Sequence, residues 1–254
     1  MKLAKNSATG LATHVAYRQE ENRSRTAKVL ITQSNYIPWK GYFDAISKVD
    51  LIVLYDEMQY TRRDWRNRNR IKTPSGLKWL TIPVKAKGNY YQKINEIEVL
   101  DSSWAEKHWK TLYHTYGKAP CFEQYASFVE TLYERAAECR LLSDVNYLFL
   151  SEISRLLGID TQFAWSRDFE LRGDKSERIL NLCHDLGATD YYTGPAAKEY
   201  MDAEAFRQQG VEIHWLDYSS YRPYPQLYGE FEHGVTVLDT LFMMGPEAKS
   251  CIFS

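Results

Sequence analysis

One segment of the chain, residues 28–72, predicts the architecture, and its sequence is KVLITQSNYIPWKGYFDAISKVDLIVLYDEMQYTRRDWRNRNRIK. Two short apolar runs, residues 29–32 and 51–55, lie on either side of an amphipathic stretch at about residues 38–48. Strand, helix and strand in this order form a βαβ unit, whose two strands are parallel. We therefore expect a parallel α/β sheet that contains both runs.

Polar side chains follow each of these two strands. Gln33 and Asn35 follow the first strand, and Asp56, Glu57 and Gln59 follow the second. Because ligands of parallel α/β sheets bind beyond the carboxyl ends of the strands, we expect the functional site at this edge. The adjacent carboxylates could hold a cation, orient a hydroxyl or amine, or act as a base. The alternative is a solvated strand terminus.

A dense arginine cluster comes next. Residues 62–70, RRDWRNRNR, contain five arginines interleaved with Trp65 and two asparagines. Guanidinium groups bind phosphate bidentately and an indole stacks on a base or sugar. The formal net charge of the chain is -1, which favours a discrete phosphorylated ligand over long nucleic acid. The alternative is a solvated basic loop, or arginines paired with the chain's own acids. The candidate binding residues here are Trp65, Asn67, Arg68, Asn69 and Arg70.

The remainder of the chain alternates helical and strand patterns. Amphipathic helices predict a helical insert at about residues 101–157, which could cover the site. Further strand patterns occur at residues 78–85, 94–100, 159–165, 191–193 and 211–216, with helices between the last three. This order predicts an α/β fold with a mostly parallel sheet, flanking helices and a central helical insert. We expect a flexible leader at residues 1–27 and a single α/β domain at residues 28–254.

Composition narrows the class of protein. Apolar residues make up 44% of the chain and charged residues 26%, which is typical of a soluble globular protein. No apolar run is long enough for a membrane span, and the N-terminal segment lacks the apolar core of a signal peptide. The four cysteines are widely spaced without a CxxC pair, so we expect no metal site and a cytoplasmic location.

His108 is the histidine best placed to act as a general base. It shares one face of a predicted helix with Trp104, Leu112 and Thr115, by three- and four-residue spacing. The alternative for such a residue is a partly buried imidazole whose hydrogen bonds are satisfied within the core.

Three further groups are candidates for ligand binding. Lys175, Ser176 and Arg178 open a predicted helix, whose free N–H groups and partial positive charge suit a phosphate or carboxylate. A helix cap is the alternative. Gly194 and Gln226 lie in turns that follow strands, where they could line the same rim, although turn chemistry alone would explain them.

At these residues the sequence resembles the WbqC-like protein family over roughly residue 28 to the C-terminus. The resemblance rests on ordered blocks at residues 33–39 (QSNYIPW), 41–43 (GYF), 55–60 (YDEMQY), 67–71 (NRNRI), 79–84 (WLTIPV), 107–109 (KHW), 175–178 (KSER), 194–197 (GPAA) and 224–226 (YPQ). The family pattern usually has a second Asp where this chain has Glu57, which keeps the carboxylate.

The resemblance implies a role in bacterial surface polysaccharide biosynthesis of the O-antigen type. It implies an acyl- or aminoacyltransferase that acts on the amine of a nucleotide-linked amino sugar. The Arg/Asn block would bind the diphosphate, and Trp39 or Trp65, with Tyr36 nearby, would contact the ring. Asp56 and His108 would orient and deprotonate the amine. The donor would be an acyl or aminoacyl thioester of an acyl carrier protein or of coenzyme A, with no other cofactor expected.

A second resemblance leaves an alternative open. Residues 38–43 and 174–176 are similar in order and spacing to the two phosphate-binding signatures of nucleotidyltransferases, although the histidines of the first signature are absent here. An ATP-dependent nucleotidyltransferase or adenylating enzyme is therefore one alternative. A non-catalytic sugar-nucleotide-binding protein is another. The acyl donor, the sugar and the oligomeric state stay open.

Overall fold

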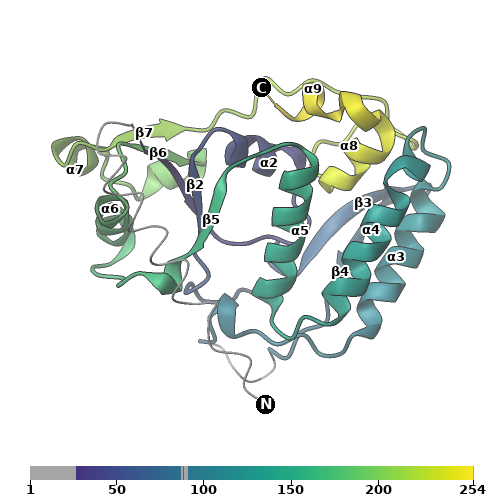
Figure 1. Cartoon of the computed structure of the whole chain (residues 1–254), viewed down its shortest axis with the longest axis horizontal. Coiled ribbons are helices and arrows are strands. Elements are labelled where there is room, and N and C mark those ends of the chain that lie inside the picture. Colours follow the sequence, from purple (N-terminus) through teal and green to yellow (C-terminus); the bar gives the residue numbers. More distant parts are fainter. Residues whose placement is uncertain (1–26, 87, 89–90, 254) are drawn as a thin grey trace, which may run out of the picture.

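The two apolar runs of the first βαβ unit form neighbouring strands of a five-stranded parallel sheet (Figure 1). The computed structural model describes residues 27–86, 88 and 91–253, so the predicted leader lies outside the described residues apart from Ala27. The sheet order is β5-β2-β1-β6-β7, and every pairing is parallel. Its strands are β1 (Lys28–Thr32), β2 (Leu51–Leu54), β5 (Gln162–Trp165), β6 (Asp190–Thr193) and β7 (Glu212–Trp215). The predicted α/β fold with a mostly parallel sheet is confirmed.

Both faces of this sheet are covered by helices, which explains why β1 and β2 are continuously apolar rather than alternating. Leu30 packs on one face, in a cluster with the helices α2 (Lys40–Ser47), α8 (Val237–Met244) and α9 (Ala248–Ile252). Val29 and Ile31 pack on the other face, in a cluster with α6 (Lys175–Asp185) and α7 (Ala203–Gln208).

Three long helices lie between β2 and β5 in the sequence, where a helical insert was predicted. They are α3 (Ser103–Tyr116), α4 (Phe122–Ala137) and α5 (Leu142–Leu156). Their apolar faces join the same hydrophobic cluster as α2 and α8. Figure 1 shows α3 and α4 on the side of the molecule away from α6 and α7, with α5 between them and the sheet.

An antiparallel hairpin precedes this insert. Two strand predictions in this region are corrected by the structure. Strand β3 (Arg68–Thr73) pairs with β4 (Gly76–Thr81), so the strand expected at residues 78–85 ends before Pro83. Strand β3 shows no apolar alternation, because Ile71 is its one apolar residue. Residues 94–100 form the 3-10 helix η1 (Ile94–Glu96) and isolated bridges instead of a strand. The other 3-10 helices are η2 (Ser166–Asp168), η3 (Pro195–Glu199) and η4 (Gly245–Glu247).

Among the residues described, no helix combines the length and the apolar character needed to cross a membrane. The same residues contain no group of three or more His, Cys, Asp or Glu side chains arranged to hold a metal ion.

Candidate functional site

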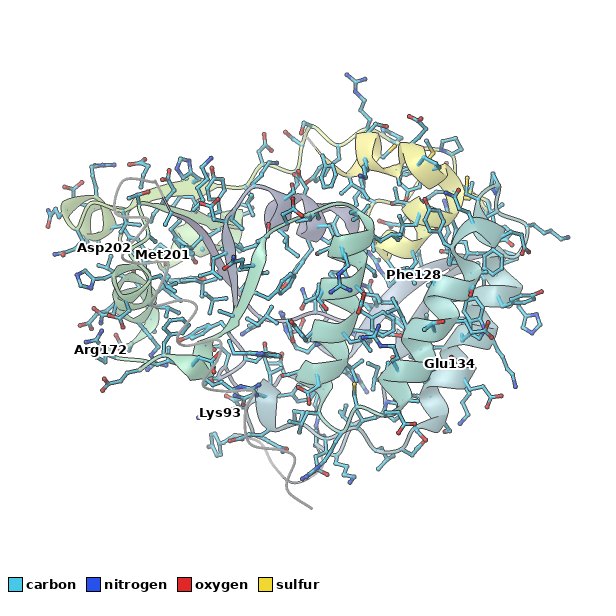
Figure 2. The ribbon with its side chains drawn as sticks, in the orientation of Figure 1. Lys93, Phe128, Glu134, Arg172, Met201 and Asp202 are labelled. Carbon is cyan, nitrogen blue, oxygen red and sulfur yellow. The ribbon has the colours of Figure 1, made fainter. Side chains whose placement is uncertain are left out.

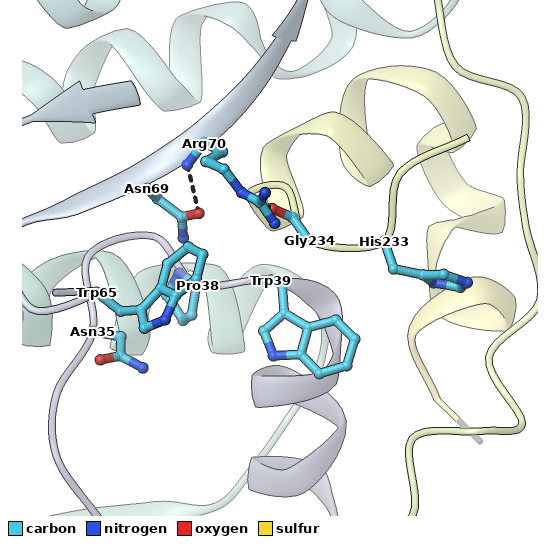
Figure 3. Close-up of a pocket in the computed structure, with 8 residues that line it drawn as sticks. All are labelled: Asn35, Pro38, Trp39, Trp65, Asn69, Arg70, His233 and Gly234. Carbon is cyan, nitrogen blue, oxygen red and sulfur yellow. Dashed lines mark hydrogen bonds between the residues drawn. The ribbon is translucent and has the colours of Figure 1, made fainter. Parts of the chain in front are cut away.

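A cavity of about 310 Å³, which we call cavity 1, opens beyond the carboxyl end of β1. Three segments meet there: the loop from β1 to α2, the start of the hairpin, and the loop that precedes α8 (Figure 3). Its lining residues are Asn35, Pro38, Trp39, Trp65, Asn69, Arg70, His233 and Gly234. The structure thus brings together Asn35, Trp39, Trp65, Asn69 and Arg70, all predicted to bind substrate.

The order of the sheet places this cavity. Strands β2 and β6 are the two neighbours of β1 in the sheet. The connection from β1 to β2 runs through α2 on one face of the sheet, whereas the connection from β6 to β7 runs through α7 on the opposite face. A crevice forms at such a switch point. Gly194 follows β6 here, and a Cβ on it would lie 3.7 Å from the hydroxyl of Tyr218. Tyr218 in turn packs edge-on against Trp39, with ring centroids 5.1 Å apart.

Asp56 is buried and holds the loop that follows β1. Its carboxylate accepts hydrogen bonds from the backbone N–H of Ser34 (2.8 Å), from the Ser34 hydroxyl (2.7 Å) and from the Ser143 hydroxyl of α5 (2.6 Å). Asn146 of α5 extends the network by donating to Ser34 Oγ (2.9 Å) and to the carbonyl of Arg66 (3.0 Å). These contacts are those of a residue that positions the loop, and the predicted catalytic role of Asp56 gains no support from them.

The same loop is joined directly to the hairpin. The N–H of Tyr36 donates to the carbonyl of Trp65 (3.1 Å). The Asn69 carboxamide donates to the carbonyls of Tyr36 (3.0 Å) and Ile37 (2.8 Å). Ile37 has a φ of 34°, which is strained for a β-branched residue and costs roughly 1–3 kcal/mol. The two hydrogen bonds from Asn69 offset this strain.

Two glycines leave room for two large cavity side chains. A Cβ on Gly41 would lie 2.4 Å from the indole of Trp39, so the absence of a side chain lets that ring lie against the start of α2. A Cβ on Gly234 would lie 2.1 Å from the guanidinium of Arg70. The position of Trp39 therefore depends on the nearby Gly41, and that of Arg70 depends on Gly234, which is distant in the sequence.

Arginines fix both sides of cavity 1. Arg70 donates from Nε to the carbonyl of Gly234 (2.9 Å) and lies 3.8 Å from the carboxylate of Glu232. Arg66 donates to Oδ1 of Asn35. The oxygen of the Asn35 carboxamide is thereby engaged, and its NH₂ is the end that can donate to a ligand.

Gln226 holds the loop that carries His233. Its carbonyl oxygen accepts from the ammonium of Lys72 (2.8 Å), and its NH₂ donates to the carboxylate of Asp239 (2.9 Å) and to the carbonyl of Glu232 (3.0 Å). Gln226, predicted to bind substrate, thus lies behind the cavity lining rather than in it.

Lys40, at the start of α2, is buried without a hydrogen-bonded carboxylate among the described residues. Its ammonium donates to the carbonyl of Arg222 (3.0 Å) and faces three aromatic rings, of Tyr221 (5.2 Å), Tyr224 (5.2 Å) and Phe231 (5.9 Å). Such cation–π contacts stabilise a desolvated ammonium. Burial still lowers the pKa of Lys40.

His233 supplies the imidazole of cavity 1. Desolvation, and then the positive charge of Lys40, lower the pKa of His233 below its usual value of 6.5. The ring is therefore neutral at neutral pH and available as a proton acceptor.

His108 lies elsewhere, in an aromatic cluster within the insert. Its Nδ1 shares a hydrogen bond with the Tyr36 hydroxyl (2.9 Å), which also bonds the Tyr133 hydroxyl (2.7 Å). The Trp104 ring packs edge-on against it at 5.2 Å. Burial lowers the pKa of His108 to about 4. Neither His108 nor Tyr36 lines cavity 1, so the base role of His108 stays a prediction.

Asn67 and Arg68 line a second cavity of about 400 Å³, cavity 2, on the hairpin. Its lining residues are Tyr60, Arg62, Arg63, Asn67, Arg68, Thr81, Val84 and Ala86. The arginine cluster is therefore divided between two cavities.

The other residues that follow the first two strands line neither cavity: Gln33, Glu57 and Gln59. Glu57 accepts hydrogen bonds from Asn95 (3.0 Å) and from the hydroxyl of Ser166. This carboxylate thus joins the ends of β2 and β5, and its predicted catalytic role stays a prediction.

The structure does not bring Lys175, Ser176 and Arg178 to either cavity. Helix α6 covers the face of the sheet opposite α2, and Ser176 accepts a hydrogen bond from the N–H of Asp202 (3.1 Å). Figure 2 shows Arg172 and Asp202 at the edge of the molecule that α6 and α7 form.

Sequence patterns do not predict His233 or Gly234 as site residues, whereas Pro38 begins the stretch at residues 38–43 that is similar to a phosphate-binding signature. Gly234 is 164 residues from its partner Arg70, and no spacing rule connects such positions. The only signal for this loop is Gln226, which belongs to one of the family-like blocks.

Comparison with known proteins agrees with the resemblance. The WbqC-like protein family matches residues 33–251. Uncharacterized protein Rv1507c of Mycobacterium tuberculosis (strain ATCC 25618 / H37Rv) is 47% identical over 221 residues, which cover 87% of this chain and 95% of that protein. No solved structure matches the chain.

The Asp56 network generates a first prediction. Asp56→Asn should lower the free energy of unfolding by about 2–3 kcal/mol, since one charge-assisted acceptor is replaced by a donor that faces other donors. For a chain of this size that is a fall in Tm of roughly 4–12 °C, measurable by thermal and urea denaturation. Glu106→Gln, at an exposed position of α3, is the control. Equal Tm values for Asp56→Asn and wild type would contradict the network's structural role.

The burial of His108 generates a second prediction. The unfolded imidazole binds a proton near pH 6.5, whereas the folded one binds it only near pH 4. The contribution of the buried neutral His108 to the free energy of unfolding should therefore be fully present above pH 6.5. It should fall by up to about 3 kcal/mol as the pH drops to about 4. Urea unfolding at several pH values should show a shallower slope for His108→Gln, and an unchanged slope for the exposed control His114→Gln. Equal slopes for both variants would contradict the burial of a neutral imidazole.

Proposed function

The chain belongs to the WbqC-like protein family, and on this premise we propose that it is an acyl- or aminoacyltransferase that acts on the amine of a nucleotide-linked amino sugar. The product would serve bacterial surface polysaccharide biosynthesis of the O-antigen type. One observation carries the proposal: cavity 1 combines two indoles, two carboxamides, a guanidinium and an imidazole whose pKa is lowered.

These groups suit a sugar that is linked to phosphate. The indoles of Trp39 and Trp65 offer apolar surfaces for the C–H face of a pyranose or for a base. Arg70 supplies a cation that binds phosphate oxygens bidentately. The NH₂ of Asn35 can donate to a hydroxyl or to a carbonyl oxygen of the ligand.

The reaction needs a proton acceptor and a donor for the developing oxyanion. The amine attacks in its neutral form, its nitrogen bonds the thioester carbonyl carbon, and His233 takes the proton that this nitrogen loses. The NH₂ of Asn35 donates to the resulting oxyanion. The carbon–sulfur bond then breaks, and the thiolate leaves as a thiol with the proton that His233 held. We assign the base role to His233 because it lines the cavity, which His108 does not.

The thioester donor would be carried by coenzyme A or by an acyl carrier protein. Neither carrier is needed as a resident cofactor, because the donor is consumed as a substrate. Transfer to an amine also needs no covalent residue on the protein.

ATP-dependent nucleotidyl transfer or adenylation is the second candidate, favoured by the doubly wound strand order with a cavity beyond β1. It would release pyrophosphate from ATP in a magnesium-dependent reaction, which acyl transfer does not require. A protein that binds the sugar nucleotide without turning over any donor would be a non-catalytic carrier.

The pH profile of the reaction generates a third prediction. Because a base acts in its deprotonated form, kcat/KM should rise with pH through an apparent pKa below 6.5 and be level at neutral pH. His233→Gln should lower kcat/KM by roughly 100- to 10,000-fold and remove this limb. The assay follows thiol release with nucleotide-linked amino sugars as acceptors.

The matched control is His114→Gln, at an exposed position outside both cavities, which should keep the wild-type profile. A wild-type rate in His233→Gln would remove His233 from the mechanism. No thiol release from any thioester donor, despite tight acceptor binding, would overturn the transferase proposal.

A further inference from the structure

Cavity 1 and cavity 2 are joined by a row of alternating arginines and tryptophans on the outer face of the hairpin. We call it the Arg–Trp ladder, and its members are Trp65, Arg68, Arg70 and Trp79. The guanidinium of Arg68 lies 3.9 Å from the centre of the Trp79 ring, and that of Arg70 lies 5.8 Å from it. Arg70 also lies 5.5 Å from the centre of the Trp65 ring.

The register of the hairpin produces this row. Arg68 pairs with Thr81 and Arg70 with Trp79, so side chains two residues apart lie on one face of the ribbon. The indoles of Trp65 and Trp79 are 39% and 40% exposed, with centroids 5.2 Å apart. Arg68 lines cavity 2 and Arg70 lines cavity 1, so the ladder is a continuous surface between them.

Cavity 2 holds the larger share of positive charge. Arg62, Arg63 and Arg68 line it, and no carboxylate is found among its described lining residues. Arg62 donates to the carbonyl of Ala86 and Arg68 donates to that of Arg63, and these bonds orient the two side chains. A bond to a carbonyl does not cancel the charge of Arg68, so this guanidinium can still attract an anion.

Asn67, which lines cavity 2, carries a buried acceptor without a hydrogen-bond partner among the described residues. Asn67 is 6% exposed, and its NH₂ donates to the carbonyl of Ile82 (2.8 Å). Within the described part of the chain, Oδ1 of Asn67 accepts no hydrogen bond, and Nε of Arg68 donates none. An unpaired buried acceptor is unfavourable, and a ligand with a hydroxyl or N–H group would satisfy it.

We propose that cavity 2 is the nucleoside diphosphate subsite of an extended ligand whose sugar occupies cavity 1. The diphosphate lies along Arg68 and Arg70, with Arg62 and Arg63 completing the anion site. A hydroxyl or N–H group of the nucleoside donates to Oδ1 of Asn67. This inference rests on the proposed nucleotide-linked substrate and assigns its two ends to two cavities.

The test is equilibrium binding without any acyl donor. The probes are UDP, ADP, GDP, CDP and dTDP, inorganic pyrophosphate, and the matching nucleotide-linked amino sugars, titrated by calorimetry at low salt. At least one nucleoside diphosphate should bind the wild type, with affinity that falls as salt is added. Arg63→Asn combined with Arg68→Gln should weaken this binding by roughly 10- to 100-fold, because two charge-assisted contacts are lost. Asparagine is chosen because the φ of Arg63 is 59°, which asparagine tolerates.

Two further variants separate the two ends of the ligand. Asn67→Ala should weaken nucleoside diphosphate binding and leave pyrophosphate binding unchanged, because only the nucleoside supplies a donor to Oδ1. Trp39→Ala should weaken binding of the amino sugar nucleotide and leave binding of the free nucleoside diphosphate within about twofold. Arg155→Gln combined with Arg207→Gln removes the same charge from exposed helical positions and is the control.

Two results would overturn the inference: no nucleoside diphosphate binds the wild type at millimolar concentration, or the Arg63/Arg68 variant binds as the wild type does. Circular dichroism identifies any variant that fails to fold. The variants that do fold then decide the outcome. Binding at cavity 2 without turnover would contradict the transferase proposal and leave the subsite proposal standing. Turnover that is insensitive to the Arg63/Arg68 change would contradict the subsite proposal alone.

Discussion

A carboxylate removed from water must be surrounded by hydrogen-bond donors, and Asp56 meets this requirement by joining three parts of the chain. Its donors come from Ser34, which follows β1, and from Ser143 at the start of α5. Asn146 of α5 donates one hydrogen bond to Ser34 and another to the carbonyl of Arg66. The sheet, the helical insert and the arginine cluster therefore hold one another in place through a single buried charge, and cavity 1 forms where they meet.

Cavity 1 is held with little freedom because its lining residues are also hydrogen-bonded to the scaffold. Asn69 holds the strained backbone of Ile37, Arg66 holds the carboxamide of Asn35, and Arg70 is held by the carbonyl of Gly234. Strained backbone at a cavity of this kind persists only where the surroundings impose it. A site with such support offers ligands a preorganised arrangement, which reduces the entropy lost on binding.

Aromatic rings accompany several cations near the two cavities. The ammonium of Lys40 faces three rings, and the guanidinium of Arg68 lies against Trp79. A ring face stabilises a cation without cancelling its charge, so the cation can still attract an anionic ligand. This arrangement reconciles a formal net charge of -1 with a locally basic surface. Desolvation, and then the charge of Lys40, lower the pKa of His233.

Much of this architecture follows from short-range patterns. The apolar runs of β1 and β2, and the amphipathic stretch between them, predict the parallel sheet because periodicity reports which faces are buried. The polar residues after β1 predict where a cavity opens, since the ends of parallel strands share one edge. Asn35, which follows β1, is found at cavity 1 for this reason.

Contacts between distant segments do not follow from such patterns. Strand β3 consists largely of Arg, Asn and Lys, and its strand conformation depends on pairing with β4 and on the hydrogen bonds of Asn69 to the loop after β1. The amphipathic face of α3 predicts that His108 points inward, but not that Tyr36 meets it there. His233 reaches cavity 1 because Gln226, Lys72 and Asp239 hold its loop against the hairpin. Periodicity reports which side of an element is buried, whereas the partner on that side depends on how the whole chain packs.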